Sequence, residues 1–83
     1  MGESSARLTF GTTKAGAVKV QLFDLNGRLV RTYLDDRAAA AGYHDVTIDG
    51  WTATGGRVPS GVYFVKIWTQ HEGSITKSLT FLK

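Results

Sequence analysis

The sequence is poor in several residue types that restrict a small fold: its 83 residues include no cysteine, one proline and one methionine. The lack of cysteine excludes a disulfide scaffold, a thiolate metal site and a catalytic cysteine. No apolar run approaches the roughly 20 residues that a membrane-spanning helix needs. The N-terminus also lacks the apolar stretch of a signal peptide, so for an exported protein we expect the signal to lie upstream.

Charge of one sign is not concentrated in any part of the chain. The formal net charge is +3, and the ten lysines and arginines are scattered along the sequence. Proteins that bind nucleic acid usually gather such charge on one face or one helix. We therefore expect no nucleic-acid partner and interpret the basic residues as aids to solubility and as protection of strand edges.

The chain does have a repeated alternation of apolar and polar residues, with the period of two that is typical of half-buried strands. The alternation is clear in Leu8 to Phe10, Val18 to Leu22, Leu29 to Leu34 and Tyr43 to Ile48. Asn26-Gly27 is a strong hairpin signal, because a type I′ turn needs positive φ at both central residues. These segments predict four strands, with a tight turn between the second and the third.

Two stretches are expected to lack regular structure. Asp35 to Gly42 contains four alanines that favour helix, but the run is too short for a stable helix. We predict a loop there, with one helical turn at most. Asp49 to Gly56 is polar and glycine-rich, and Arg57-Val58 is expected to pair briefly after it.

The C-terminal segment predicts a hairpin. After the break at Pro59-Ser60-Gly61, strand-forming runs over Val62–Thr69 and Thr76–Leu82 flank a turn at Glu72-Gly73. The phase of the alternation places these side chains in the core: Tyr63, Val65, Ile67, Ile75, Leu79 and Phe81. Lys77 falls in the same phase, so its stem is expected to lie along apolar surface while its ammonium reaches the rim.

Together these elements predict the fold class. Six or seven short strands with turns at this spacing are typical of a small all-β, Ig-like antiparallel sandwich. The length fits one domain over residues 1–83. A domain of this size has a modest core and little room for a deep pocket.

Three segments resemble one known family in order along the chain. Asp24 to Arg31 (DLNGRLVR), Ala41 to Gly50 (AGYHDVTIDG) and Arg57 to Phe64 (RVPSGVYF) are similar to motifs of the FlgD Ig-like family. Lys77 and Lys83 stand where the related C-terminal sorting domains of type IX secretion cargo keep their last two lysines. The chain departs from the family at Ile48, where tryptophan is usual, and in lacking the family's opening Asn-Pro-Phe-type motif.

The resemblance implies a non-catalytic bacterial module at the C-terminus of a larger secreted or cell-surface protein. In type IX cargo such a domain is read as a sorting signal by the outer-membrane translocon, whereas in the flagellar hook-capping protein the same fold serves assembly. The implied partners are the secretion translocon or the catalytic domain of the parent protein. No cofactor, metal or transmembrane segment is implied.

The resemblance marks Gly61, Tyr63, Lys77 and Lys83 as a sorting or recognition motif. The alternative is structural: a glycine that the bend needs, a tyrosine in the core and lysines that guard an edge.

The hairpin motif Asp24, Asn26, Gly27 and Arg28 has part of the pattern of a calcium loop. A full loop needs more oxygen ligands and a glutamate at its twelfth position, which this segment lacks. We therefore expect Asp24 to accept hydrogen bonds from backbone donors beside the turn, and no metal.

The residue types of a hydrolytic triad are also present, in Ser60, His44, His71, Asp45 and Asp49. Catalysis needs the nucleophile, base and acid to converge, and these residues stand at turns and strand starts where ordinary surface residues are common. We predict no catalytic residue and no enzyme activity.

Trp51, Phe64 and Trp68 form a candidate aromatic contact surface. Such a strip stacks on sugar rings in carbohydrate-binding sandwiches, but it also covers sheet faces and docks on neighbouring domains. The main prediction is a module for secretion sorting or cell-surface attachment. A carbohydrate-binding accessory module and a structural or assembly spacer domain are the alternatives.

Overall fold

The computed structural model describes residues 5–50 and 56–81, and within this part of the chain every regular element is a strand. β1 and β4 pair in one sheet, while the other sheet has the order β3-β2-β5-β6. The strands are β1 (Ser5–Thr12), β2 (Gly16–Phe23), β3 (Leu29–Ala39), β4 (Gly42–Asp49), β5 (Gly61–Thr69) and β6 (Gly73–Phe81). All pairs are antiparallel, so the predicted Ig-like antiparallel sandwich is confirmed.

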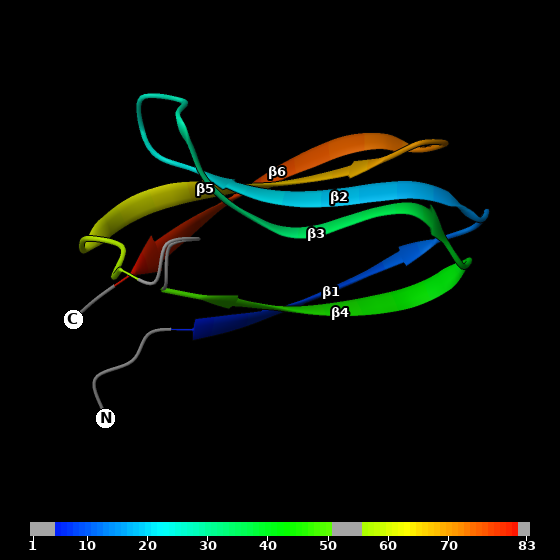
Figure 1. The fold of residues 1–83 in the computed structure, drawn as a ribbon, viewed down its shortest axis with the longest axis horizontal. Coiled ribbons are helices and arrows are strands. Elements are labelled where there is room, and N and C mark those ends of the chain that lie inside the picture. The colour runs from blue at the N-terminus through cyan, green and yellow to red at the C-terminus, as the bar shows by residue number, and fades with distance from the viewer. Residues whose placement is uncertain (1–4, 51–55, 82–83) are drawn as a thin grey trace.

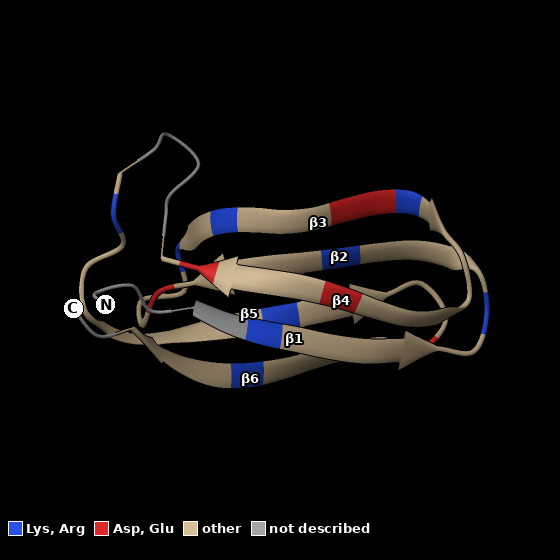
Figure 2. Ribbon diagram, turned by 90° about the horizontal axis from the view of Figure 1, so that it is seen from below, with Lys and Arg blue, Asp and Glu red and all other residues tan. Residues whose placement is uncertain are grey.

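The two sheets form two layers (Figure 1). Viewed from the two-stranded side, β4 lies over the β2–β5 side of the larger sheet and β1 over its β5–β6 side (Figure 2). In this view β6 lies to the side of β1, and β3 lies to the side of β4, so neither edge strand is covered by the smaller sheet (Figure 2). The smaller sheet therefore covers only the central part of the larger one.

The core fills the space between the layers, and alternation along the strands supplies it. The buried cluster consists of Val20, Leu22, Ile48, Val58, Tyr63, Val65, Ile67 and Phe81. Leu22, Ile48 and Val20 are the largest side chains among those almost completely buried. The inward placement predicted for Tyr63, Val65 and Ile67 of β5 is confirmed. In β6 the prediction holds for Phe81 but not for Ile75, which is 59% exposed.

The predicted loop over residues 35–42 is wrong, because β3 continues through Ala39. Its second half pairs with the start of β2, where Gly16 lies opposite Ala39 and Lys19 opposite Asp35. Three irregularities in the β2–β3 register let the long strand follow the sheet. Pairing with β2 thus outweighs the weak helical preference of the alanines.

The turn between β2 and β3 is not type I′ as predicted. Gly27 has a φ of 83°, but no described non-glycine residue has positive φ, so Asn26 does not. The amide of Gly27 donates to the carbonyl of Asp24, and the amide of Asp24 donates to the carbonyl of Arg28. This pattern fits a type I turn followed by a left-handed glycine, which also joins neighbouring strands compactly.

The C-terminal hairpin agrees with the prediction. Its register runs without a break from Gly61 opposite Phe81 to Thr69 opposite Gly73. Arg57 makes the brief bridge expected before Pro59, and the amide of Val58 donates to the carbonyl of Gly50 at 2.7 Å. Within the described chain, no helix is long and apolar enough to cross a membrane.

Candidate docking face

The outer face of the four-stranded sheet carries an unusual set of side chains. Val20 and Leu22 point into the core, so Lys19, Gln21 and Phe23 point outward from β2. The same rule turns these β5 side chains outward: Val62, Phe64, Lys66 and Trp68. We call this surface the outer face.

The β2–β5 register brings these outward residues together in rows. Phe23 lies opposite Phe64, Gln21 opposite Lys66 and Lys19 opposite Trp68. Directly opposite residues in antiparallel strands have their Cβ atoms about 4.5–5.5 Å apart, so each row is a contact pair. Leu29 of β3 extends the first row, because it pairs with Phe23.

Exposed apolar surface is concentrated on this face. The exposed large apolar residues of the described chain are Leu25, Leu29, Tyr43, Val62, Trp68 and Ile75. Four of them belong to the outer face or its rim: Leu25, Leu29, Val62 and Trp68. The Gln21–Lys66 row separates Trp68 from the apolar residues at the other end of the face. Exposed apolar patches with polar residues around them mark interaction sites in soluble proteins.

A shallow, open depression of about 330 Å³ lies at one end of the face. Its apolar floor comes from Phe23, Leu25 and Phe64, and its polar side from Asp24, Lys66 and Thr76. The depression is too open to enclose a small molecule, since small-molecule sites bury most of their ligand. It fits a projecting side chain of a partner surface.

The polar groups of the outer face are two lysines, one carboxylate, one amide and several hydroxyls, and Asp35 of β3 lies opposite Lys19. Lys19 and Lys66 lie among the aromatic rings, and Gln21 Nε2 donates to Thr32 Oγ1 at 3.3 Å. Ser74, Thr76 and Ser78 lie opposite Trp68, Lys66 and Phe64 on β6. The strand pairing that places these polar groups beside the aromatic rings is not visible along the chain.

The candidate aromatic surface is assembled in part. Phe64 and Trp68 share the outer face, and Trp68 is 39% exposed while Phe64 is half-buried. Trp51 lies outside the described residues.

Of the sorting-motif residues, Tyr63 is part of the core, Gly61 lies at the start of β5 and Lys77 lies in β6. Tyr63 is buried, its ring meets Phe81 edge to face at 5.5 Å, and its hydroxyl donates to the Pro59 carbonyl at 2.7 Å. Burial raises the pKa of Tyr63, with a further rise from the charge of Asp24. Gly61 has a φ of 154° and Lys77 lies on an edge strand, while Lys83 is outside the described residues.

The hairpin-motif residues organise the β2–β3 turn, as predicted for Asp24. One carboxylate oxygen of Asp24 accepts hydrogen bonds from the amides of Asn26 and Arg28, both at 2.9 Å. These contacts, led by the Arg28 amide, lower the pKa of Asp24. The described residues contain no cluster of three or more His, Asp or Glu side chains that could hold a metal ion.

The triad candidates have separate partners. His44 bonds to the Ala40 carbonyl and stacks on Phe10 with ring centroids 5.3 Å apart. Asp45 accepts from Thr9 Oγ1 at 2.6 Å, and Asp49 binds Arg31 at 2.7 Å. None of these three contacts joins an acid to a histidine.

Sequence reasoning missed a clasp that joins the two sheets at one side. Arg31 of β3 forms an ion pair with Asp49 of β4, and its guanidinium lies 4.6 Å from the centroid of the Tyr33 ring. The Tyr33 hydroxyl donates to the carbonyl of Asp49 at 2.5 Å. Burial and the negative charge of Asp49 raise the pKa of Tyr33 to about 12.

The architecture defines an Ig-like antiparallel β-sandwich domain. The model of the FlgD Ig-like domain family matches residues 2–73, which is most of the chain. The chain therefore belongs to the FlgD Ig-like domain family.

Solved structures of FlgD share this fold. FlgD from P. aeruginosa is 23% identical with a TM-score of 0.68, over 94% of this chain and 58% of that one. A truncated FlgD from Helicobacter pylori is 21% identical with a TM-score of 0.63, over 96% of this chain and 62% of that one. This chain thus spans about three fifths of each of these chains. No curated protein matches it.

Proposed function

We propose that this domain is a non-catalytic structural module that helps a larger bacterial protein to assemble. Its membership of the FlgD Ig-like family supports an assembly role, because the solved relatives are FlgD proteins. This reading was an alternative at the sequence level, and it now has more support than secretion sorting or surface attachment. The outer face would be the surface that docks.

The observation that carries the proposal is the concentration of exposed apolar side chains on one sheet face. The outer face of the smaller sheet differs, since it presents Arg7, Thr9, Asp45 and Thr47. Only the exposed ring of Tyr43 is large and apolar there among the described residues, and it lies against Gly11. A domain with more exposed apolar surface on one face than on the other has a defined side for a partner.

The experiment compares two double variants in the full-length protein of the native host. Val62→Ser with Trp68→Ser removes an exposed apolar side chain from each end of β5 on the outer face, whereas Arg7→Ser with Thr47→Ala alters the polar face. We expect the first variant to leave its assembly on size-exclusion chromatography while the isolated domain keeps its melting temperature. Equal loss in both variants, or loss in neither, would contradict a docking role for the outer face.

Sorting and carbohydrate binding remain the rival functions. Fusing residues 1–83 behind a periplasmic reporter in a host with type IX secretion would test sorting, and a reporter that stays in the periplasm counts against it. Affinity gels with soluble and insoluble glycans, comparing Trp51→Ala and Trp68→Ala, would test stacking on sugars. The assembly role predicts neither export nor retardation.

A further inference from the structure

On the opposite side of the four-stranded sheet from the outer face, part of the inward surface is not covered by the smaller sheet. Strand β6 extends beyond β1, so nothing in the described chain covers part of its inward side (Figure 2). Ile75 lies directly opposite buried Ile67 and shares its side of the sheet, yet 59% of Ile75 is exposed. Lys77 is exposed in the same phase, and Leu79 is half-buried. We call Ile75, Lys77 and Leu79 the β6 ledge.

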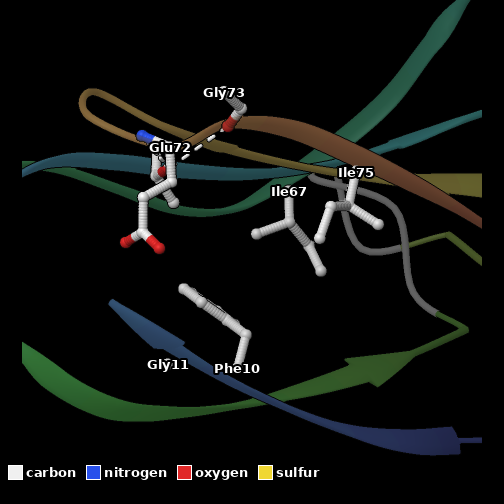
Figure 3. A pocket seen from close by; sticks show the side chains of 7 residues that line it. Phe10, Gly11, Ile67, Glu72, Gly73 and Ile75 are labelled. Atoms are coloured by element: carbon white, nitrogen blue, oxygen red, sulfur yellow. Dashed lines mark hydrogen bonds between the residues drawn. The ribbon is translucent and has the colours of Figure 1, made fainter. Parts of the chain in front are cut away.

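The ledge borders a hollow between the two sheets. The hollow has a volume of about 70 Å³ and is lined by Phe10, Gly11, Ile67, Thr69, Glu72, Gly73 and Ile75. Figure 3 shows Phe10 rising from β1 on one side, with Ile67 and Ile75 opposite it across a gap. The gap is mostly apolar and about the size of one small aliphatic side chain.

Strand β1 has a free edge beside this hollow. It pairs along its whole length with β4 on one side, and with no described strand on the other. A free strand edge presents backbone N–H and C=O groups to which another strand can add. A strand placed there would lie above the β6 ledge and point alternate side chains into the space between the sheets.

We propose that the free edge of β1 accepts one extended segment from another polypeptide, which completes the smaller sheet as a third strand. The segment runs antiparallel to β1, as all pairs in this fold do. The residue opposite Phe10 is aliphatic and fills the hollow. This surface is separate from the outer face, so the inference does not rest on the proposed function.

Charge specifies the next inward residue of the segment. Strands β1 and β6 run in opposite directions (Figure 1), so moving from Phe10 to Leu8 corresponds to moving from Ile75 to Lys77. Lys77 is the one charged residue of β6, and it forms no ion pair within the described chain. A carboxylate opposite Leu8 would lie above this ammonium. The segment therefore carries an aliphatic residue followed two positions later by Asp or Glu.

A second folded copy of this domain does not fit the same place. In a second copy, β1 is already covered by its own larger sheet, whose β6 extends past it (Figure 2). Pairing two β1 edges would force the two β6 strands into the same space. The occupant is therefore a single extended strand.

The test uses residues 1–83 and a peptide of nine residues with capped ends. Its sequence is threonine, valine, threonine, valine, threonine, aspartate, threonine, valine, threonine. We expect binding by isothermal titration calorimetry, and slower hydrogen exchange at the β1 amides that do not donate to β4. Ile75→Lys should abolish binding because the new side chain fills the hollow. Trp68→Ser, on the outer face, should leave the affinity unchanged.

A charge exchange tests the pairing with Lys77. Cross-strand charge pairs are modest, so Lys77→Glu should weaken the aspartate peptide roughly two- to fivefold. The same variant should bind better to a peptide with lysine in place of aspartate. Thr76→Glu adds the same charge on the opposite side of β6 and should not show this reversal. No binding of either peptide to a folded domain, protection of β6 or outer-face amides instead of β1, or dimerisation through β1 would each overturn the proposal.

Discussion

Single residues hold the two sheets together at points that the hydrophobic pattern does not reveal. The clasp of Arg31, Tyr33 and Asp49 connects β3 to the end of β4 through an ion pair, a hydrogen bond and a cation–π contact. At the other end of the molecule, Thr13 donates its amide to Glu72 at 3.0 Å and so ties two turns together. These contacts form between positions far apart in the sequence.

Because of Tyr33, the free energy of unfolding should depend on pH in the alkaline range. Its pKa in the folded protein is raised to about 12, above the ordinary value of 10.0. The folded state therefore favours the neutral phenol: this contribution is complete below pH 10 and is lost as the pH rises through about 12. We expect urea midpoints to fall over this range, and to fall less in Tyr33→Phe.

The same substitution has an effect at neutral pH. Tyr33→Phe removes the hydrogen bond to the Asp49 carbonyl and should lower the free energy of unfolding by about 1 kcal/mol at pH 8. Tyr43→Phe, on an exposed ring, is the matched control and should change it by less than about 0.5 kcal/mol. An unaltered alkaline fall in Tyr33→Phe would show that other groups cause it.

Gly27 provides a second test at the level of one residue. Its φ of 83° is in the left-handed region, where a β-carbon is unfavourable by about 1–2 kcal/mol. No atom lies within 4 Å of the position of an added β-carbon, so a crowding effect is not expected. Gly27→Ala should therefore lose about 1–2 kcal/mol in chemical denaturation. Asn26→Ala in the same turn should lose clearly less, and an equal loss would mean that backbone strain is not the cause.

At the scale of elements, strands with an alternating pattern were predicted from the sequence. A segment that is a strand only because it pairs with a neighbour was not predicted. Val18 to Leu22 alternates strictly between apolar and polar residues, and Tyr63, Val65 and Ile67 recur at every second position of β5. In both segments these alternate side chains are buried. The second half of β3 has no such pattern, since it is held by its partner β2. The exposure of Ile75 could not be predicted either, because a phase shows which side a residue faces and not whether another sheet covers that side.

The candidate docking face was likewise predictable within one strand but not across the pairing of several strands. That Phe64 and Trp68 share a face was predictable from their spacing on one strand. That Phe23 and Leu29 join them depends on the register of two further pairings. Register is fixed by turns and packing between strands, so one strand's sequence does not reveal its neighbours.

Phe81 tests whether the final strand is part of the core. Its side chain is buried and meets Tyr63 edge to face. Phe81→Ala should lower the free energy of unfolding by about 3–5 kcal/mol, a large share of the 5–15 kcal/mol typical of small domains. Thermal melts followed by circular dichroism would measure it, with Phe81→Leu as a milder variant and Thr80→Ala as the exposed control. Equal melting temperatures for all three variants would show that β6 does not support the fold.

At the scale of the whole molecule, the sandwich has two unlike outer faces and a two-stranded sheet that leaves part of the four-stranded sheet uncovered. The four-stranded sheet presents aromatic and aliphatic side chains with lysines among them, whereas the two-stranded sheet is mostly polar. An independent soluble domain has no need of such an asymmetry. A module that docks on a neighbour by one side needs such an asymmetry. Docking through the outer face is the central claim of the proposed function.

Site-specific photo-crosslinking in the native host tests this claim most directly. A photoreactive phenylalanine analogue replaces Trp68 on the outer face or, as the matched control, Thr47 on the polar face, in the full-length protein. The account predicts a discrete crosslinked product from position 68, to a neighbouring domain or assembly partner, and little or none from position 47. Crosslinking from position 47 with none from position 68 would contradict it.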